Sequence, residues 1–148
     1  MNSFTMLNMW RMSSMSWNIL GSIAVWTAVG AVLLFVLMYI DSIFTKYKDI
    51  TEIKAGNNAV ATRLVMKLFA QGYILSVAIG TSWSLGEAVL VSVVSFVILL
   101  ILELIVRFLL KNTVGLDLDE GTKQGQIGYG LLGGALQIVG ALIISASL

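Results

Sequence analysis

The sequence predicts an all-α integral membrane protein: a four-helix bundle made of two tandem two-helix repeats in parallel orientation. Composition is the first reason, because 58 % of the 148 residues are hydrophobic and only 11 % are charged. Soluble domains carry about a quarter charged residues. The mean hydropathy of +0.94 points the same way. Four long apolar stretches and a recurring charged connection are the other reasons, and together they exclude a water-soluble monomer.

The residue types that the sequence lacks exclude most classes of enzyme and metal site. The chain has no Cys and no His, so thiol catalysis, thiolate metal sites and the commonest general base are absent. A net charge of +1 is too small for binding to nucleic acid. No glycine-rich phosphate loop, nucleophile–base pair or metal-ligand spacing occurs. We therefore expect no enzymatic activity, no metal and no cofactor.

Four stretches have the roughly 20 mostly apolar residues that a helix needs to cross a bilayer. They span about residues 17–40, 59–80, 88–110 and 127–148. Hydrocarbon offers no partner to an unpaired backbone group, so each must be a helix. The first apolar run is longer than that of a signal peptide, and we expect it to be retained as an anchor.

Basic residues set the expected orientation. The first and third connections and their borders carry most of them: Lys46, Lys48, Lys54, Arg107, Lys111 and Lys123. The middle connection, residues 81–87, carries none. By the positive-inside rule the first and third connections are cytoplasmic, and both termini lie outside.

The two halves of the chain follow one plan: helix, charged connection, helix. At an offset of about 66 residues the second helix of each half contains a glutamine, Gln71 and then Gln137. Two spans in each half give both copies the same orientation, related by a pseudo-twofold axis along the membrane normal. The alternative is a pattern common to any four-helix protein.

Residues 46–61 read KYKDITEIKAGNNAVA and lead into a helix of small and polar residues. This segment resembles the signature of the DUF350 (UPF0719) family of bacterial inner-membrane proteins, most specifically in the pattern E-I-x-x-G-N-N-A-x-A. The resemblance covers about residues 17–148. It implies a four-span protein of two such units in the bacterial cytoplasmic (inner) membrane, and it implies no activity. The second half departs from it, with KQGQ at residues 123–126.

Polar residues inside the spans form a candidate site. Arg63, Lys67 and Gln71 recur every four residues on one helix face, and Glu103 precedes Arg107 by four. Lys67 and Glu103 lie at equal depth, which predicts an ion pair that sets the register of two helices while the arginines reach the headgroups. The alternatives are a lipid-headgroup site and an ion path. The ion path would be lined by Lys67, Gln71, Glu103 and Gln137.

Gly56, Asn57 and Asn58 precede the second span. Glycine and asparagine adopt left-handed turns, and an asparagine side chain accepts from the free amides of a helix start, so the triplet predicts a helix cap. The alternative is a lipid-phosphate site, because Lys54 and Arg63 flank the positive end of the helix.

Small residues follow one stripe of the fourth span. Gly130, Gly133, Gly134 and Ala141 would let another helix approach closely. The seam serves packing within one subunit or contact between subunits, and the sequence leaves both open.

Residues 1–16 form a Met-rich extracytoplasmic tail, with Met6, Met9, Met12 and Met15 at three-residue spacing. We expect a tail that is disordered or lies on the membrane. The alternative is a copper-collecting tail, since thioethers bind Cu(I).

Our functional hypothesis is a non-enzymatic accessory or structural subunit that forms a homo-oligomer among membrane lipids. It would present the connections at residues 41–58 and 111–126 to a cytoplasmic or membrane protein partner. The alternative is a small ion channel or transporter that uses the Lys67/Glu103 layer. An intramembrane enzyme, with Glu103 as its acid, is the third alternative.

Overall fold

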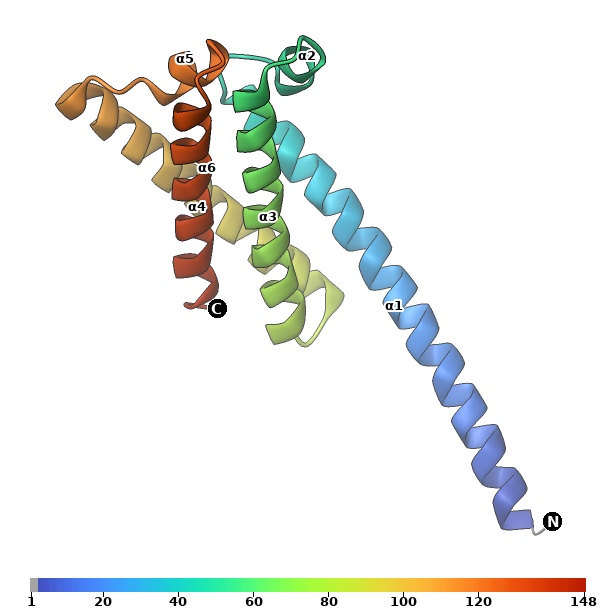
Figure 1. Cartoon of the computed structure of the whole chain (residues 1–148). Coiled ribbons are helices and arrows are strands. Elements are labelled where there is room, and N and C mark those ends of the chain that lie inside the picture. Colours follow the sequence, from blue (N-terminus) through green and yellow to red (C-terminus); the bar gives the residue numbers. More distant parts are fainter. Residues whose placement is uncertain (1–2) are drawn as a thin grey trace. The chain divides into compact units, whose positions relative to one another are not determined.

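A computed structural model describes the backbone of residues 3–148 and the side chains of residues 3–9 and 17–148. The described part contains six helices and no strand. They are α1 (Ser3–Ile43), α2 (Asp49–Lys54), α3 (Asn58–Thr81), α4 (Leu85–Val114), α5 (Leu118–Lys123) and α6 (Ile127–Ser145). By these bounds α1, α3, α4 and α6 are long, and α2 and α5 are short helices at one end of the bundle (Figure 1). The all-α prediction is confirmed.

Four segments are long and apolar enough to cross a membrane: Trp17–Ile43, Asn58–Thr81, Leu85–Val114 and Ile127–Ser145. Each contains most of one predicted span. Helix α4 extends beyond the predicted third span, residues 88–110, at both ends. Ser84 caps its start by accepting from the Glu87 amide, and Gly115, at φ 73°, ends it.

The chain divides into two compact units, residues 1–33 and 34–148. The first unit is most of α1, and its described side chains are largely exposed, as suits a helix surrounded by lipid. The sequence predicts a tail that is separate from the first span. This separation is wrong, because α1 begins at Ser3 and continues without a break through the Met-rich segment into that span. Met6 and Met9 are exposed, whereas the side chains of Met12 and Met15 lie outside the described residues.

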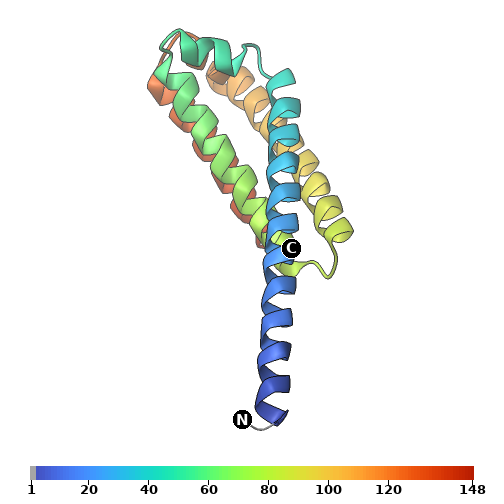
Figure 2. The same cartoon turned by 90° about the vertical axis from the view of Figure 1, so that its right-hand side faces the viewer.

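The second unit is centred on α3 and α6, which run side by side with α4 crossing them (Figures 1 and 2). Glycines make this close packing possible. A Cβ at Gly130 would lie 2.3 Å from the backbone oxygen of Ala59, and one at Gly134 would lie 2.6 Å from the sulfur of Met66. The glycine seam is therefore used within the chain, where α6 meets α3, and it is not free to join two subunits.

The short helices α2 and α5 reveal where the repeat lies. Each is followed by a left-handed glycine, Gly56 at φ 86° and Gly125 at φ 82°. The amides of Asn57 and Gln126 then bond back to the carbonyls of Glu52 and Gly121 in the same way. The equivalent positions are 69 residues apart, from 56 to 125, so the expected offset of about 66 is wrong.

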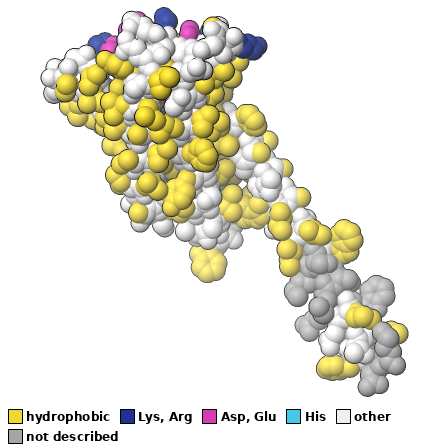
Figure 3. Space-filling model, in the orientation of Figure 1, with side chains coloured by type: hydrophobic (Ala, Val, Ile, Leu, Met, Phe, Trp, Pro, Cys, Tyr) yellow, Lys and Arg dark blue, Asp and Glu magenta, His cyan; other side chains and the backbone are white. Residues whose placement is uncertain are grey.

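A small apolar cluster fills the bundle away from its charged end. It consists of Ala70 and Ile74 of α3, Leu99 of α4, and Ala141 and Ile144 of α6. On the face drawn in Figure 3, the charged side chains gather at the end that carries α2 and α5, and hydrophobic side chains cover the flanks. This distribution fits a bundle whose flanks contact lipid and whose charged end lies at the membrane surface.

Candidate functional site

The candidate site is a network of six charged side chains at the charged end of the second unit, five buried and Arg107 partly buried: Arg63, Glu103, Arg107 and Asp119 are joined by ion pairs, and Lys67 and Asp41 form a pair beside them. Four helices supply its members: Asp41 of α1, Arg63 and Lys67 of α3, Glu103 and Arg107 of α4, and Asp119 of α5. Arg63 is 1 % exposed and Lys67 2 % exposed, because both lie on the face of α3 that packs into the bundle.

Arg63 is the centre of the network. Its guanidinium donates from Nη1 to Asp119 Oδ1 at 2.8 Å and from Nη2 to Glu103 Oε1 at 3.0 Å. The Nη1 atom also donates to the hydroxyl of Tyr47 at 3.0 Å. Burial raises the pKa of Tyr47 to about 12, so this hydroxyl stays neutral. The expectation that Arg63 reaches the headgroups is wrong, because two carboxylates hold it inside the protein.

Lys67 pairs with Asp41 and not with Glu103. Its Nζ lies 2.5 Å from Asp41 Oδ2, and both side chains are buried. The predicted Lys67–Glu103 pair is wrong for a geometric reason. The end of α1 brings Asp41 to Lys67, while Glu103 faces Arg63. A signal existed in the sequence, since Asp41 directly follows an uncharged apolar run and so stands at the end of a span.

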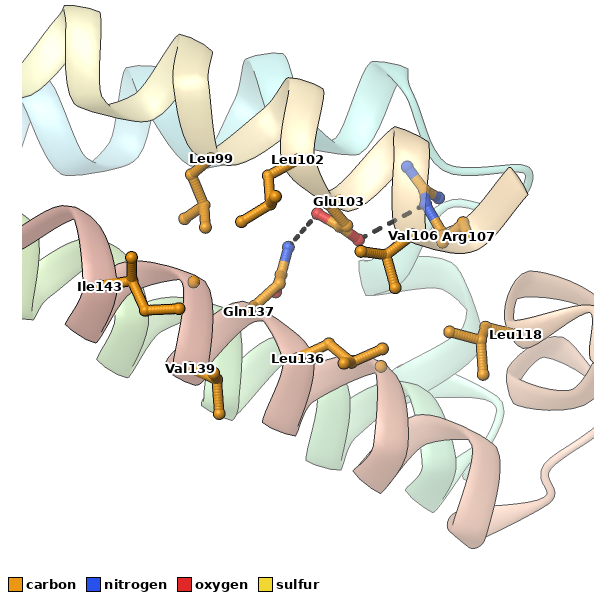
Figure 4. A pocket seen from close by; sticks show the side chains of 12 residues that line it. Leu99, Leu102, Glu103, Val106, Arg107, Leu118, Leu136, Gln137, Val139 and Ile143 are labelled. Carbon is orange, nitrogen blue, oxygen red and sulfur yellow. Dashed lines mark hydrogen bonds and ion pairs between the residues drawn. The ribbon is translucent and has the colours of Figure 1, made fainter. Parts of the chain in front are cut away.

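Glu103 joins three helices. It accepts from Arg63 on α3 and from the side-chain amide of Gln137 on α6. Arg107 Nε lies 3.6 Å from Glu103 Oε1, which confirms the predicted (i, i+4) contact. Figure 4 shows Glu103 between Gln137 and Arg107, at the edge of a pocket of about 200 Å³ between α4 and α6. Apolar side chains line most of that pocket.

Asp119 fixes the short helix α5 to the bundle. Arg107 Nη1 donates to its Oδ1 at 2.9 Å and to its Oδ2 at 2.8 Å, and Arg63 Nη1 also donates to Oδ1 at 2.8 Å. Burial raises the pKa of Asp119, but the charges of Arg63 and Arg107 outweigh that effect and hold the pKa below its usual value. Asp119 is therefore a carboxylate that holds α3, α4 and α5 together.

The charges of the network balance. Arg63, Lys67 and Arg107 supply three positive charges, and Asp41, Glu103 and Asp119 supply three negative charges. Burying an unpaired charge is very unfavourable, whereas a paired one with good geometry can be tolerated. The arrangement thus explains how so many charged groups can lie inside a membrane bundle.

Two glutamines complete the predicted polar layer, and they differ in their hydrogen bonds. Gln137 contacts Glu103, whereas Gln71 is buried without a hydrogen bond to its side-chain oxygen from any described residue. The structure therefore joins Glu103 and Gln137 in one contact, and Lys67 belongs to a separate pair. The described residues include no group of three or more acidic side chains that could hold a metal ion.

Asn57 caps α3, which confirms the predicted cap. Its Oδ1 accepts from the amides of Ala59 and Val60 at 3.1 Å and 3.2 Å. The alternative of a lipid-phosphate site at this cap included Arg63 as a phosphate ligand. That part is wrong, because Arg63 is buried and paired with two carboxylates. Lys54 and Asn58 are exposed beside the cap, and Gly56 supplies the left-handed turn.

Asn57 has a second role that the sequence did not reveal. Its Nδ2 donates to the carbonyls of Lys123 at 2.8 Å and Thr122 at 3.2 Å, both at the end of α5. One side chain therefore joins the connection of the first repeat to that of the second.

Comparison with protein families matches residues 14–148 to DUF350, described as a Domain of Unknown Function. No curated protein and no solved structure matches the chain. The four helices that can cross a membrane make the chain a multi-pass membrane protein. Because the family match covers nearly the whole sequence, the protein belongs to the DUF350 family.

Proposed function

We propose that this protein is a non-enzymatic subunit of the bacterial cytoplasmic membrane that presents a rigid platform to a protein partner. The platform consists of α2, α5 and the turns at residues 55–57 and 124–126. The observation that supports it most is the attachment of Asp119 to Arg63 and Arg107, which uses buried charges to hold a six-residue helix in place. So short a helix is not stable by itself.

The outward side of the platform suits protein recognition. Ile50 on α2 is 61 % exposed, and the exposed Lys54 and Lys123 lie at the ends of α2 and α5. An exposed apolar side chain with charges around it resembles the centre and rim of a transient interface. By the positive-inside rule, the platform lies in the cytoplasm and both termini lie outside.

Homo-oligomerisation is part of the proposal, but through other surfaces than the glycine seam. Gly130 and Gly134 already contact α3, so subunits would meet through lipid-facing sides of the long helices. Native mass spectrometry of the protein released from lipid nanodiscs gives the subunit number.

Site-specific photo-crosslinking in native membranes tests the platform. A photoreactive residue at Lys123, exposed at the end of α5 and outside the groove beside α1, should give a discrete protein adduct, whereas one at Trp83, exposed on the connection between α3 and α4, serves as the control. Equal labelling from both positions, or labelling of lipid alone from Lys123, would contradict the proposal.

A small ion channel or transporter is the second candidate. The observation in its favour is the depth of polar groups between the spans, where Gln71 and Gln137 each have a side-chain oxygen without a partner among the described residues. Against it, the apolar cluster around Ile74 and Leu99 lies beyond this layer in the same bundle. The substitution Glu103→Gln should change ion flux if this candidate is right.

A further inference from the structure

A groove of about 850 Å³ opens beside the end of α1, away from the pocket between α4 and α6. Its walls are residues 35–43 of α1, the connection that follows, the first turn of α2 and Leu64 of α3. Because α1 ends here, the groove lies at the depth where acyl chains give way to headgroups.

The walls of the groove change in polarity along its length. Phe35, Met38 and Leu64, which lie within the spans, are apolar. Lys46 and Lys48, which lie in the connection, are basic and exposed. Tyr39 is 71 % exposed between these two regions, as is typical of aromatic residues at a membrane surface. The groove therefore matches an amphipathic molecule that has an apolar chain and a phosphate.

Asp49 adds a feature that phosphate binding does not explain. It lines the groove and is only 7 % exposed, yet its carboxylate has no hydrogen bond or ion pair with any described residue. Burial raises the pKa of Asp49, and the nearby positive charge of Lys67 offsets this only in part. Lys67 is already paired with Asp41, so no cation among the described side chains pairs with Asp49 alone.

The two lysines differ in how freely they can bind a ligand. Lys48 has no ion pair among the described residues, and the side chain of Lys46 is 52 % exposed although its Nζ lies 3.0 Å from Asp117. The groove thus offers two ammonium groups at its rim and one carboxylate on its inner wall.

We infer that this groove holds one phospholipid whose headgroup carries both a phosphate and a primary ammonium, as phosphatidylethanolamine does. Lys46 and Lys48 bind the phosphate, Asp49 accepts hydrogen bonds from the ammonium, and an acyl chain lies along Phe35, Met38 and Leu64. A primary ammonium has three N–H donors. A trimethylated choline headgroup has none, and a glycerol headgroup has no positive charge. The inference does not depend on a protein partner.

Lipid retention by the full chain tests the inference. The protein is reconstituted in nanodiscs of equal parts phosphatidylethanolamine, phosphatidylcholine and phosphatidylglycerol, then released, and its bound lipids are identified by native mass spectrometry. We expect one phosphatidylethanolamine to be retained about tenfold over phosphatidylcholine, the ratio that one charge-assisted hydrogen bond provides. Equal retention of all three lipids overturns the inference, as does a preference for phosphatidylglycerol.

Four variants locate the site. Asp49→Asn should abolish the preference for phosphatidylethanolamine over phosphatidylcholine, and Lys48→Gln should lower retention of every phospholipid. The matched controls are Glu120→Gln and Lys123→Gln, exposed on α5 outside the groove, and they should retain lipids as the parent does. A preference that survives Asp49→Asn overturns the assignment. Because the preference is a ratio within one sample, it does not depend on yield.

Ser42→Phe provides a test that leaves every charge in place. Ser42 lines the groove, so a phenyl ring there fills the space an acyl chain would occupy. We expect loss of the retained lipid with an unchanged melting temperature in detergent. Retention unchanged from the parent would place the lipid elsewhere and overturn the inference.

Discussion

The guanidinium of Arg63 lies 2.8 Å from the carboxylate of Asp119, a residue 56 positions further along the chain. This contact joins the second helix of the first repeat to the short helix of the second repeat. Arg63 also binds Glu103, so a single side chain connects α3, α4 and α5. The consequence is that charges inside the bundle determine where the platform outside it lies.

Replacing Arg63 with Gln should strongly destabilise the protein. After the change, Arg107 is the remaining cation for both carboxylates. It lies 3.6 Å from Glu103 and pairs with Asp119 at 2.8 Å. Breaking a buried pair by removing one partner costs about 3–5 kcal/mol. Thermal unfolding in detergent measures the loss, and the exposed Lys54→Gln is the control that should change nothing. A melting temperature equal for both variants would mean that the network does not support the fold.

Two equally buried acids should respond in opposite directions to neutralisation at pH 7. Asp119 and Asp49 are both 7 % exposed, but the pKa of Asp119 is lowered and that of Asp49 is raised. The Asp119 carboxylate therefore stabilises the fold above its unfolded pKa of about 3.9, and this contribution is lost as the pH falls through its folded pKa. The Asp49 carboxylate has the opposite effect, and its destabilisation develops as the pH rises through its folded pKa.

Unfolding of the two variants between pH 3 and pH 8, in detergent without phospholipid, checks these signs. Asp119→Asn should lower the free energy of unfolding at pH 7 and flatten the acid limb of the profile. Asp49→Asn should raise the free energy of unfolding at pH 7. Destabilisation by both variants would show that Asp49 has a partner in the folded protein after all.

The glycine seam should not tolerate a side chain at Gly130, where α6 approaches α3 most closely. Gly130→Ala places a methyl group 2.3 Å from the Ala59 carbonyl oxygen, which forces α6 away from α3. Overpacking of this kind costs about 1–3 kcal/mol. Gly128→Ala on the same helix meets nothing within 4 Å and should be neutral or slightly stabilising. If Gly130→Ala changes only the oligomeric state and not the melting temperature, the seam lies between subunits.

Asn57→Asp should separate the two roles of this residue. The carboxylate still accepts from the amides of Ala59 and Val60, so the cap of α3 is kept. The Nδ2 donor to the Thr122 and Lys123 carbonyls and to the Glu52 carboxylate is lost. We expect faster hydrogen exchange at the end of α5 with little change in α3. Faster exchange in α3 alone would indicate that capping is the only role.

Much of the fold can be read from the sequence because its strongest signals are local. A run of about 20 apolar residues has few outcomes other than a spanning helix, and all four were identified. The Asn57 cap and the Glu103–Arg107 contact depend on spacing along one helix, so they too could be predicted.

The errors concern the relation of one helix to another. Whether Lys67 meets Glu103 or Asp41 depends on how the helices rotate and on where α1 ends, which periodicity within one helix does not reveal. The short helices α2 and α5 have six residues each and lie in charged connections, so they produce no periodic apolar signal. The use of Gly130 within the chain likewise depends on which helix lies opposite.

Ion flux through reconstituted vesicles tests the central claim most directly, namely that the buried charges are structural. Vesicles with the parent protein and with Glu103→Gln are loaded with a pH-sensitive or potassium-sensitive dye and compared with lipid alone. Our account predicts no flux above lipid for either protein, and a lowered melting temperature for the variant because Arg63 loses a charged partner. A flux through the parent that Glu103→Gln alters, with the fold intact, would contradict the account and identify the buried layer as an ion path.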